Sequence, residues 1–285
     1  MPLKDGKTLV KHAAENKYAV AMINTNGADY EIIRAIAEVA EEERSPVMFG
    51  AYAANLAYRG HEYAAMVMNM FAEKSSVPMA SHLDHSGSAE DCKRAIDAGF
   101  TSVMIDGSKK PFAENLAMVK EVCAIAKPKG VSVEAEIGEL QRIEEDGSMG
   151  EVKNLADPKE VQRISEESDI DMLAVGIGNA HGFYKGEPEI HTELLDEFRK
   201  VSEVPLVLHG TTGLSEKIIH ECIRLGIAKI NLGTQIRTAC VKYTADAIEN
   251  TEHKGHPWKI GVVVKDKLKE EVRDFLKLIG SVGKA

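Results

Sequence analysis

The chain of 285 residues lacks the features of a membrane or secreted protein. It has no apolar run long enough to cross a bilayer, and its first residues, MPLKDGKTLVKHAAENKYAV, lack the unbroken apolar segment of a secretory signal. There are only four cysteines, Cys92, Cys123, Cys222 and Cys240, and none belongs to a C-x-x-C pair. We expect them to be small buried side chains rather than disulfides or metal ligands. Together these absences predict a cytoplasmic protein.

Basic residues are in the minority, with 35 lysines and arginines against 45 aspartates and glutamates, for a net charge of −10. Non-specific binding to nucleic acid or to anionic lipid needs a positive face, so we expect neither partner. The charge does not exclude a phosphorylated small molecule, because backbone amides and a few local cations can hold a phosphate inside an acidic protein.

Short β-rich runs alternate with longer segments of helical period, which is typical of βα units on a parallel sheet. The eight predicted strands are residues 18–24, 46–52, 77–83, 102–107, 131–138, 172–178, 205–210 and 229–234. Eight strands with helices between them close a (β/α)₈ TIM barrel. No linker rich in proline, glycine or serine interrupts this order, so we predict one α/β domain over residues 1–285.

Two segments of the predicted domain stand apart from the repeating units. Residues 139–157, ELQRIEEDGSMGEVKNLAD, are polar and acidic and form a longer connection than βα units usually have. We interpret them as a mobile active-site loop. Residues 250–285 are expected to form a C-terminal helical tail.

Histidines collect where the active site of such a barrel forms, at the C-terminal ends of the strands. His85, His181 and His209 follow three different predicted strands. One such histidine is more often a hydrogen-bonded structural residue than a ligand, but three on one rim predict a catalytic zinc with an open fourth position. Asp84 is then an acid/base candidate. His82 lies in the middle of the strand and is expected to form a hydrogen bond either to a residue that supports a metal ligand or to a residue of the core.

Carboxylates and glycine-rich turns share this predicted rim. Asp106 ends the fourth strand and Glu136 lies in the fifth. The turns HGTTGLSEK and NLGTQIR each open a helix, where barrels commonly bind phosphate. The hydroxyls of Thr212 and Thr234 are expected to face the anion, or else to serve only as helix N-caps.

Six longer motifs resemble those of the zinc-dependent class II aldolases of the fructose-bisphosphate and tagatose-bisphosphate type, over almost the whole chain. They are HLDHSGS, TSVMIDGSKKPFAEN, GVSVEAEIG, AVGIGNAHGFYKGEP, PLVLHGTTGL and KINLGTQIR. The resemblance implies a lyase of carbohydrate metabolism, such as glycolysis, that reversibly cleaves a ketose 1-phosphate or 1,6-bisphosphate to dihydroxyacetone phosphate and an aldehyde. The alternatives are an aldolase of another acidic sugar phosphate and a barrel that binds sugar phosphates without turnover.

The resemblance also implies cofactors and partners. Zn²⁺ is the expected cofactor, with His85, His181 and His209 at the ligand positions and Asp106 and Glu136 at acidic positions near the metal. A monovalent cation, Na⁺ or K⁺, is also compatible with the resemblance. The expected partners are a small sugar phosphate and further copies of the chain, in a homodimer or homotetramer.

Two carboxylates match the acid/base positions of the family. Asp84 matches the residue that handles the proton of the C4 hydroxyl, and Glu144 matches the loop carboxylate that takes the proton from the dihydroxyacetone phosphate carbon. The resemblance and the strand-end positions together predict further residues that contact or border the substrate: Asn24, Ser108, Gly182, Gly210, Thr211, Thr212, Asn231, Gly233 and Thr234.

The chain departs from the family pattern at positions that bear on the substrate. Thr211 and Thr212 replace smaller residues after the last zinc histidine, and Gln141 and Arg142 replace a glycine pair in the loop. Loop closure could bring the Arg142 guanidinium to the distal end of the substrate, where a phosphate or another acidic group would pair with it. The alternative is a solvated ion pair with acidic neighbours in the loop.

Two other enzyme classes fit the sequence less well. A Schiff-base aldolase needs a desolvated lysine near the C-terminal end of a strand, whereas Lys229 opens its predicted strand and is expected to point to the opposite rim. A metallohydrolase would commonly show a His-x-His pair at the first strand, where this chain has INTN.

Overall fold

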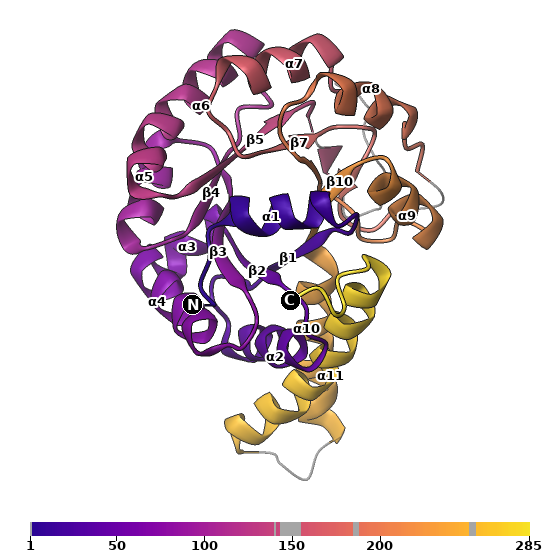
Figure 1. Ribbon diagram of the computed structural model, residues 1–285. Helices are drawn as coiled ribbons and strands as arrows, with labels where there is room; N and C mark the ends of the chain where they lie inside the picture. Colours follow the sequence, from indigo (N-terminus) through magenta and orange to yellow (C-terminus); the bar gives the residue numbers. More distant parts are fainter. Residues whose placement is uncertain (1, 140, 143–154, 185–187, 251–254) are drawn as a thin grey trace.

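The computed structural model describes residues 2–139, 141–142, 155–184, 188–250 and 255–285, and its parallel strands close into a barrel ringed by helices (Figure 1). In barrel order the strands are β1 (Val20–Asn24), β10 (Ile227–Leu232), β9 (Leu206–Leu208), β7 (Met172–Val175), β5 (Ser132–Ile137), β4 (Ser102–Ile105), β3 (Met79–Ser86) and β2 (Val47–Tyr52). These are the eight predicted strands with slightly different bounds, so the (β/α)₈ fold is confirmed.

Helices connect the strands and cover the outside of the barrel. They are α2 (Tyr30–Glu42), α3 (Ala53–Arg59), α4 (His61–Lys74), α5 (Ala89–Ala98), α6 (Phe112–Ala126), α7 (Pro158–Glu167), α8 (Glu193–Val201), α9 (Glu216–Arg224) and α10 (Thr234–Asn250), with a 3₁₀ turn at Lys127–Lys129. Short polar residues start several of them. Asp29, Ser88, Asp157 and Ser215 each accept a hydrogen bond from a backbone N–H of the first turn, which satisfies one of its unpaired donors.

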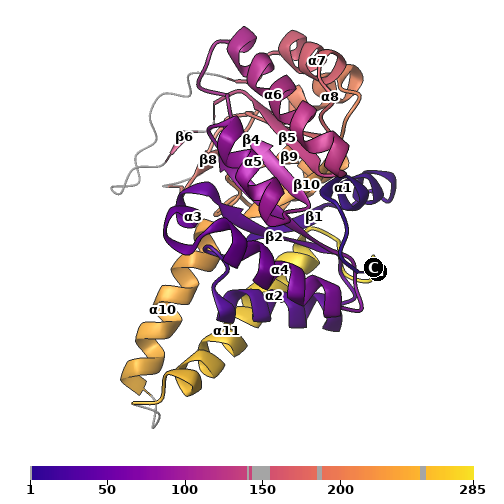
Figure 2. The same cartoon turned by 90° about the vertical axis from the view of Figure 1, so that its left-hand side faces the viewer.

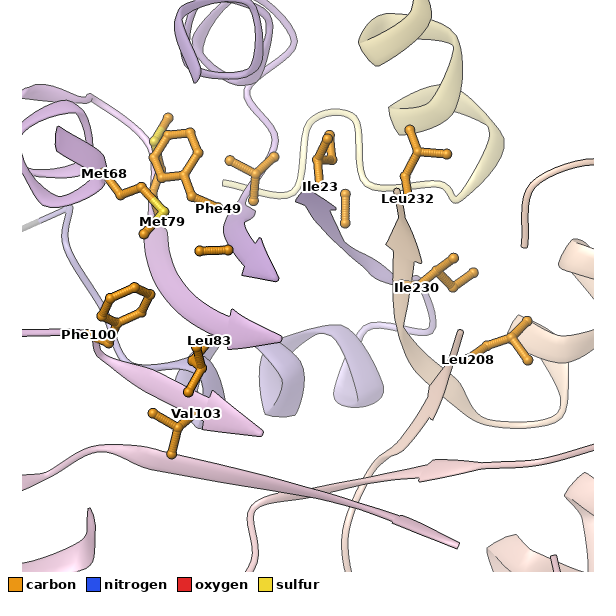
Figure 3. Close-up of a cluster of buried hydrophobic side chains, with 14 of the residues drawn as sticks. Ile23, Phe49, Met68, Met79, Leu83, Phe100, Val103, Leu208, Ile230 and Leu232 are labelled. Carbon is orange, nitrogen blue, oxygen red and sulfur yellow. The ribbon is translucent and has the colours of Figure 1, made fainter. Parts of the chain in front are cut away.

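The alternation of side chains along each strand separates two cores. Outward-facing residues such as Phe49, Leu83 and Val103 pack in the outer core between the strands and the helices, where Met68 of α4 lies beside Phe49 (Figure 3). Inward-facing apolar residues fill the barrel interior: Val20, Met22, Met48, Ala80, Met104, Met172, Ala174 and Val207. Cys92, Cys123 and Cys222 are buried free thiols, as predicted, and Cys240 is partly exposed.

One end of the barrel is closed by the first helix, α1 (Gly6–Glu15). Leu9, Val10 and Ala13 of this helix belong to the interior apolar cluster, and the Lys7 N–H donates to Ser132 Oγ at the start of β5. Figure 2 shows α1 on the opposite side of the barrel from the small sheet of β6 (Gln141–Arg142) and β8 (Ala180–His181). Because α1 closes the N-terminal end of the strands, a site has room only at their C-terminal end.

The two last helices form a hairpin that projects beyond the ring of helices (Figures 1 and 2). Its second helix, α11 (Pro257–Leu278), packs along α2 and belongs to the predicted C-terminal tail. Ion pairs join α11 to α2: Glu38 Oε2 of α2 lies 3.0 Å from Lys265 Nζ and 3.1 Å from Lys269 Nζ of α11. Among the described residues, no helix is long and apolar enough to span a membrane.

The ion pairs of Glu38 predict a pH-dependent contribution to stability. Burial alone would raise the pKa of Glu38, but hydrogen bonds from Lys265, Lys269 and Arg34 outweigh it and lower the pKa from 4.5 to about 2. A carboxylate whose pKa is lower in the folded state stabilises the fold above its unfolded pKa, and this contribution is lost as the pH falls toward the folded value. Glu38→Gln should therefore lower the melting temperature at pH 7, at a cost of about 1 kcal/mol.

The difference from wild type should shrink as the pH falls from about 5 toward 3, measured by circular dichroism at a series of pH values. The exposed Glu73 of α4 provides the control, since Glu73→Gln should change the melting temperature little at any pH. A deficit for Glu38→Gln that stays constant with pH would contradict the ion-pair explanation.

Candidate active site

Three histidines from different segments meet at the C-terminal end of the barrel. His85 lies near the end of β3, His181 ends β8, and His209 directly follows β9. A ring nitrogen of each lies within 4.8 Å of a ring nitrogen of the other two. The structure therefore brings together the three histidines that the sequence singled out.

A local irregularity lets Asp84 and His85 share this site. Consecutive residues of a regular strand point to opposite faces, so one of the two would otherwise turn toward the helices. The pairing of β3 with β4 shifts its register between Leu83 and Ser86, and His85 has a left-handed φ of 51°. Such a bulge redirects a side chain, at the cost of an unfavourable backbone conformation for a non-glycine residue.

His181 is positioned by the segment around it rather than by a barrel strand. The Tyr184 hydroxyl accepts a hydrogen bond from the Ala180 N–H at 2.6 Å and donates to the Gly210 carbonyl at 2.8 Å. Asn179 Nδ2 donates to the His209 carbonyl at 2.8 Å. Sequence reasoning did not assign these two side chains, whose only signal is that they flank His181. They hold the His181 segment against the turn that carries His209.

The turn after His209 needs a glycine. Gly210 has a φ of +63°, and a Cβ there would lie 2.5 Å from the Ala180 carbonyl oxygen, which is backbone and cannot move aside. A side chain at this position would therefore push the His181 and His209 segments apart.

Carboxylates behind two of the histidines determine which ring nitrogens face the site. Asp106 Oδ2 lies 2.8 Å from His85 Nδ1, and Glu134 Oε1 lies 2.8 Å from His209 Nε2. Because a carboxylate accepts, both of these nitrogens carry a hydrogen. The remaining nitrogens, His85 Nε2 and His209 Nδ1, face one another at 2.9 Å. Histidines held in this way by a carboxylate are typical of metal ligands.

The charges around His85 favour a cation at the centre of the site. Burial lowers the pKa of His85, but Asp84, Asp106 and Glu136 outweigh it and raise the pKa to about 10. Burial and the neighbouring positive charge of His85 hold the pKa of His209 well below its usual 6.5. Burial also raises the pKa of Asp84 and, more strongly, that of Glu136.

These residues fit a zinc ion in three respects. Three imidazoles are a usual ligand set for catalytic zinc, which binds them in the neutral form, and a cation in the site would replace the positive charge of His85. The carboxylates surround the position with negative charge. Glu136 Oε2 is buried without a hydrogen-bond partner in the part of the chain that the structure describes, 3.8 Å from His209 Nδ1, and such an oxygen needs a partner such as a cation. His85, Asp106 and Glu136 form a second group whose donor atoms lie within 4.8 Å of one another.

Asp84 lies beside the histidines and is linked to β10. Its Oδ1 is 4.0 Å from His85 Nε2 and accepts a hydrogen bond from Asn231 Nδ2 at 3.3 Å. At 7% exposure, Asp84 still touches solvent at the open end of the barrel. The predicted acid/base group is therefore next to the three histidines.

The expectation for Lys229 is wrong. Its side chain is fully buried inside the barrel, where Nζ donates to Asn231 Oδ1 at 2.7 Å and lies 2.8 Å from Glu134 Oε2. The strand begins two residues earlier than predicted, and Lys229 shares the inward face of β10 with Asn231, whereas Ile230 and Leu232 face the helices. Its flexible stem then reaches along the barrel toward the site. The ammonium donates to the Asn231 oxygen and forms an ion pair with Glu134, and both contacts suit a charged lysine rather than the neutral amine of a nucleophile.

The predicted phosphate-binding residues lie close together on three neighbouring segments. Thr211 and Thr212 are buried in the turn after β9, and Thr234 starts α10 directly after Gly233. A Cβ on Gly233 would lie 3.9 Å from that of Asn24, at the end of β1. These segments are neighbours because β10 pairs with both β9 and β1.

Several of these side chains already have partners. The Thr211 hydroxyl donates to the Asn231 carbonyl at 2.8 Å, and Asn24 Oδ1 accepts from the Asn26 N–H at 2.8 Å. Ser108 donates its hydroxyl hydrogen to Asp106 Oδ1 at 2.7 Å, so it supports the carboxylate behind His85. Gly182 follows His181 with a φ of +121°.

The start of the predicted mobile loop contacts the histidine site through its backbone. Gln141 and Arg142 form β6, which pairs in parallel with Ala180 and His181 of β8. Glu144 and the side chain of Arg142 lie outside the described residues.

Two more side chains border the site. The ring of Tyr52, at the end of β2, lies edge-on to His85 with centroids 6.4 Å apart, and Tyr52 pairs with Asp84 in the β2–β3 register. Tyr52 was not among the site residues predicted from the sequence. His82 is fully buried and its Nδ1 lies 2.8 Å from Ser102 Oγ, so it makes the expected hydrogen bond in the barrel.

Comparisons with known proteins agree on one family. A profile described as fructose-bisphosphate aldolase class II matches residues 4–284. The chain is 43% identical over 282 residues to the 6-phospho-5-dehydro-2-deoxy-D-gluconate aldolase of Bacillus licheniformis, covering 98% of this chain and 95% of that protein. It is 40% identical over 288 residues to a fructose-bisphosphate aldolase of Staphylococcus aureus, covering 100% of both.

A solved structure supports the same assignment. The crystal structure of the YdjI aldolase from Escherichia coli K12 superposes with a TM-score of 0.88 at 32% sequence identity, covering 99% of both chains. The profile, the curated relatives and the fold thus coincide over almost the whole sequence, and the chain belongs to the class II fructose-bisphosphate aldolase family, as an aldolase and therefore a lyase.

Proposed function

We propose that this protein catalyses the zinc-dependent, reversible aldol cleavage of a ketose 1-phosphate or ketose 1,6-bisphosphate to dihydroxyacetone phosphate and an aldehyde. The observation that carries the proposal is the convergence of His85, His181 and His209 beside Asp84 at the open end of the barrel. In this proposal the three imidazoles hold the ion, while Asp106 and Glu134 orient two of them.

The chemistry requires charge stabilisation next to a carbonyl and a proton acceptor at the neighbouring hydroxyl. A bound zinc ion supplies Lewis acidity to the ketone oxygen and to the negative charge that develops beside it. Asp84 accepts the proton of the C4 hydroxyl as the C3–C4 bond breaks, so that C4 leaves as an aldehyde and the bond electrons pass to the three-carbon enediolate. In condensation Asp84 returns the proton. Its raised pKa suits a group that must both accept and donate.

Further residues have proposed roles around these steps. Asn231 holds Asp84 in place and contacts the substrate. Backbone amides of Gly210 and Gly233, with the start of α10 at Thr234, bind the phosphate, since helix N-termini favour anions. Glu144 protonates the enediolate carbon when the loop closes, and Arg142 recognises the distal end of the substrate.

A second substrate class is favoured by one comparison. The Bacillus licheniformis relative, at 43% identity, is named for 6-phospho-5-dehydro-2-deoxy-D-gluconate. An acidic sugar phosphate of this type would place a carboxylate where a bisphosphate has its second phosphate, and Arg142 would pair with either group. Assays with both substrates distinguish the two.

The cellular setting belongs to the proposal as well. We infer a cytoplasmic enzyme of carbohydrate metabolism that forms a homodimer or homotetramer, with Na⁺ or K⁺ as a second ion. A barrel that only binds sugar phosphates is less well supported, because the three histidines and Asp84 are all present and close together.

Removal of metal tests the zinc assignment. Treatment with a strong chelator should abolish cleavage, and one equivalent of Zn²⁺ per chain should restore it, in an assay coupled to triose-phosphate detection. Mg²⁺ should not restore activity, because it prefers oxygen ligands to three imidazoles. Full activity in protein shown to be metal-free by elemental analysis would contradict the proposal.

Replacement of Asp84 tests its role in proton transfer. Asp84→Asn keeps the shape and an acceptor for Asn231, so it should lower kcat by on the order of 10²-fold or more with zinc still bound. Asp171→Asn is a matched control, because Asp171 is also buried but pairs with Lys7 and Lys127 away from the site. It should lower the melting temperature without a comparable loss of kcat. Loss of zinc with unchanged turnover per bound metal would make Asp84 an orienting group instead.

A further inference from the structure

A buried ammonium group lies below the histidine site, and the geometry points to a role for it in catalysis. We propose that Lys229 is a positioning residue that turns the Asn231 amide toward Asp84 and, through Glu134, holds His209 in the orientation of a metal ligand. The inference rests on the proposed function, because it concerns the acid/base group and one histidine of that site.

Lys229 is enclosed by the barrel. It pairs with Val20 in the β1–β10 register, and Val20 belongs to the apolar interior cluster. The whole residue is 0% exposed. An ammonium in such surroundings is costly unless acceptors or an opposite charge lie close to it. Lys229 Nζ donates to Asn231 Oδ1 at 2.7 Å and forms an ion pair with Glu134 Oε2 at 2.8 Å, and each of these partners leads to a different functional group.

The first link sets the direction of an amide. A carboxamide has one accepting oxygen and one donating nitrogen, and its two orientations differ by a flip. Because an ammonium can only donate, it holds Asn231 Oδ1 on its own side. The Nδ2 group must then point the other way, where it donates to Asp84 Oδ1 at 3.3 Å. Without Lys229, Asn231 could flip and present its oxygen to Asp84, which would repel the carboxylate.

The second link concerns a histidine. Glu134 uses its two oxygens on different partners: Oε2 lies 2.8 Å from Lys229 Nζ, and Oε1 lies 2.8 Å from His209 Nε2. The carboxylate is fully buried, so the ammonium provides the positive charge that lets it stay in place. With Glu134 held, His209 keeps its hydrogen on Nε2 and presents Nδ1 to the site.

Stability alone does not account for this arrangement. Buried ion pairs commonly add little to stability compared with apolar residues of the same volume, because the charges lose their hydration. The lower part of the same barrel is filled by Met22, Met48, Met104 and Met172, which shows that methionine fits this interior. A lysine at position 229 is therefore better explained by the two acceptors that it orients.

A double-mutant cycle between Lys229 and Asn231 tests the proposal. Lys229→Met keeps the volume and removes the donor, and it should lower kcat by about tenfold or more with a smaller change in KM. If Lys229 acts through Asn231, the double variant Lys229→Met/Asn231→Ala should have nearly the kcat of Asn231→Ala alone. Additive losses in the double variant would overturn the link to Asn231.

Zinc affinity provides a readout that does not depend on turnover. In competition with a chromophoric chelator, Lys229→Met should bind Zn²⁺ about tenfold more weakly, the size expected for loss of support behind a metal-binding histidine. Unchanged affinity would overturn the link through Glu134 to His209.

Lys127→Met is the matched control. Lys127 also pairs with a buried carboxylate, since its Nζ lies 2.9 Å from Asp171 Oδ1. It lies in the 3₁₀ turn after α6, outside the barrel interior, and within the described part of the chain its ion pairs are with Asp169 and Asp171, away from the histidine site. Its loss should lower the melting temperature with kcat, KM and zinc affinity unchanged. Equal losses of kcat in both variants would reduce Lys229 to a general stabilising residue.

Two further outcomes are distinguishable. If Lys229→Met does not fold, Lys229→Leu, which also removes the donor and the charge, takes its place and should show the same non-additivity with Asn231→Ala. If the wild-type protein binds zinc but cleaves no sugar phosphate, the proposed function fails, while the zinc affinities still test Lys229. If the wild type cleaves and Lys229→Met matches it in kcat and zinc affinity, only the inference about Lys229 fails.

Discussion

The pairing of β1 with β10 closes the sheet, and the geometry of the site depends on this closure. In a closed parallel barrel every strand delivers its C-terminal end to the same rim. His85 and His209 are 124 residues apart in sequence, yet their ring nitrogens meet at 2.9 Å. With α1 and the methionine-rich cluster filling the N-terminal half, the group of histidines and carboxylates lies at the other end.

Within this frame, one departure from regular strand geometry brings two neighbouring polar residues to the site. The register shift in β3 lets Asp84 and His85 both reach it. A regular strand would give the site every second residue only, as β10 does with Lys229 and Asn231. The bulge in β3 therefore allows neighbouring strand residues to serve one centre, as bulges near active sites often do.

The charges in the barrel balance one another in a connected group. Glu134 stands between Lys229 and His209, while Asp106 accepts from His85 and from Ser108. These buried charges thus have a group of opposite sign or a hydrogen-bond donor nearby, which a low-dielectric interior requires. Glu134 Oε2 and Glu136 Oε2 make no hydrogen bond within the described part of the chain. Glu134 Oε2 has the Lys229 ammonium at 2.8 Å, whereas Glu136 Oε2 lies 3.8 Å or more from the imidazole nitrogens of His85 and His209, beside the group proposed to hold the cation.

The sequence by itself determined the number and order of the strands, and therefore the barrel. It also identified His85, His181, His209 and Asp84 as residues of one rim, because strand periodicity and strand ends are local patterns that a single chain displays.

Only the tertiary structure decided which side chains pair with one another. The carboxylates behind His85 and His209 and the partners of Lys229 depend on contacts between distant strands, and these leave no periodic signal in the sequence. The bulge in β3 leaves none either, since a bulge changes the direction of a side chain without changing the residue types around it. The direction of Lys229 was mispredicted because its strand position does not reveal where the long stem ends: the ammonium extends toward Asn231 and Glu134, which only the closed barrel brings within its reach.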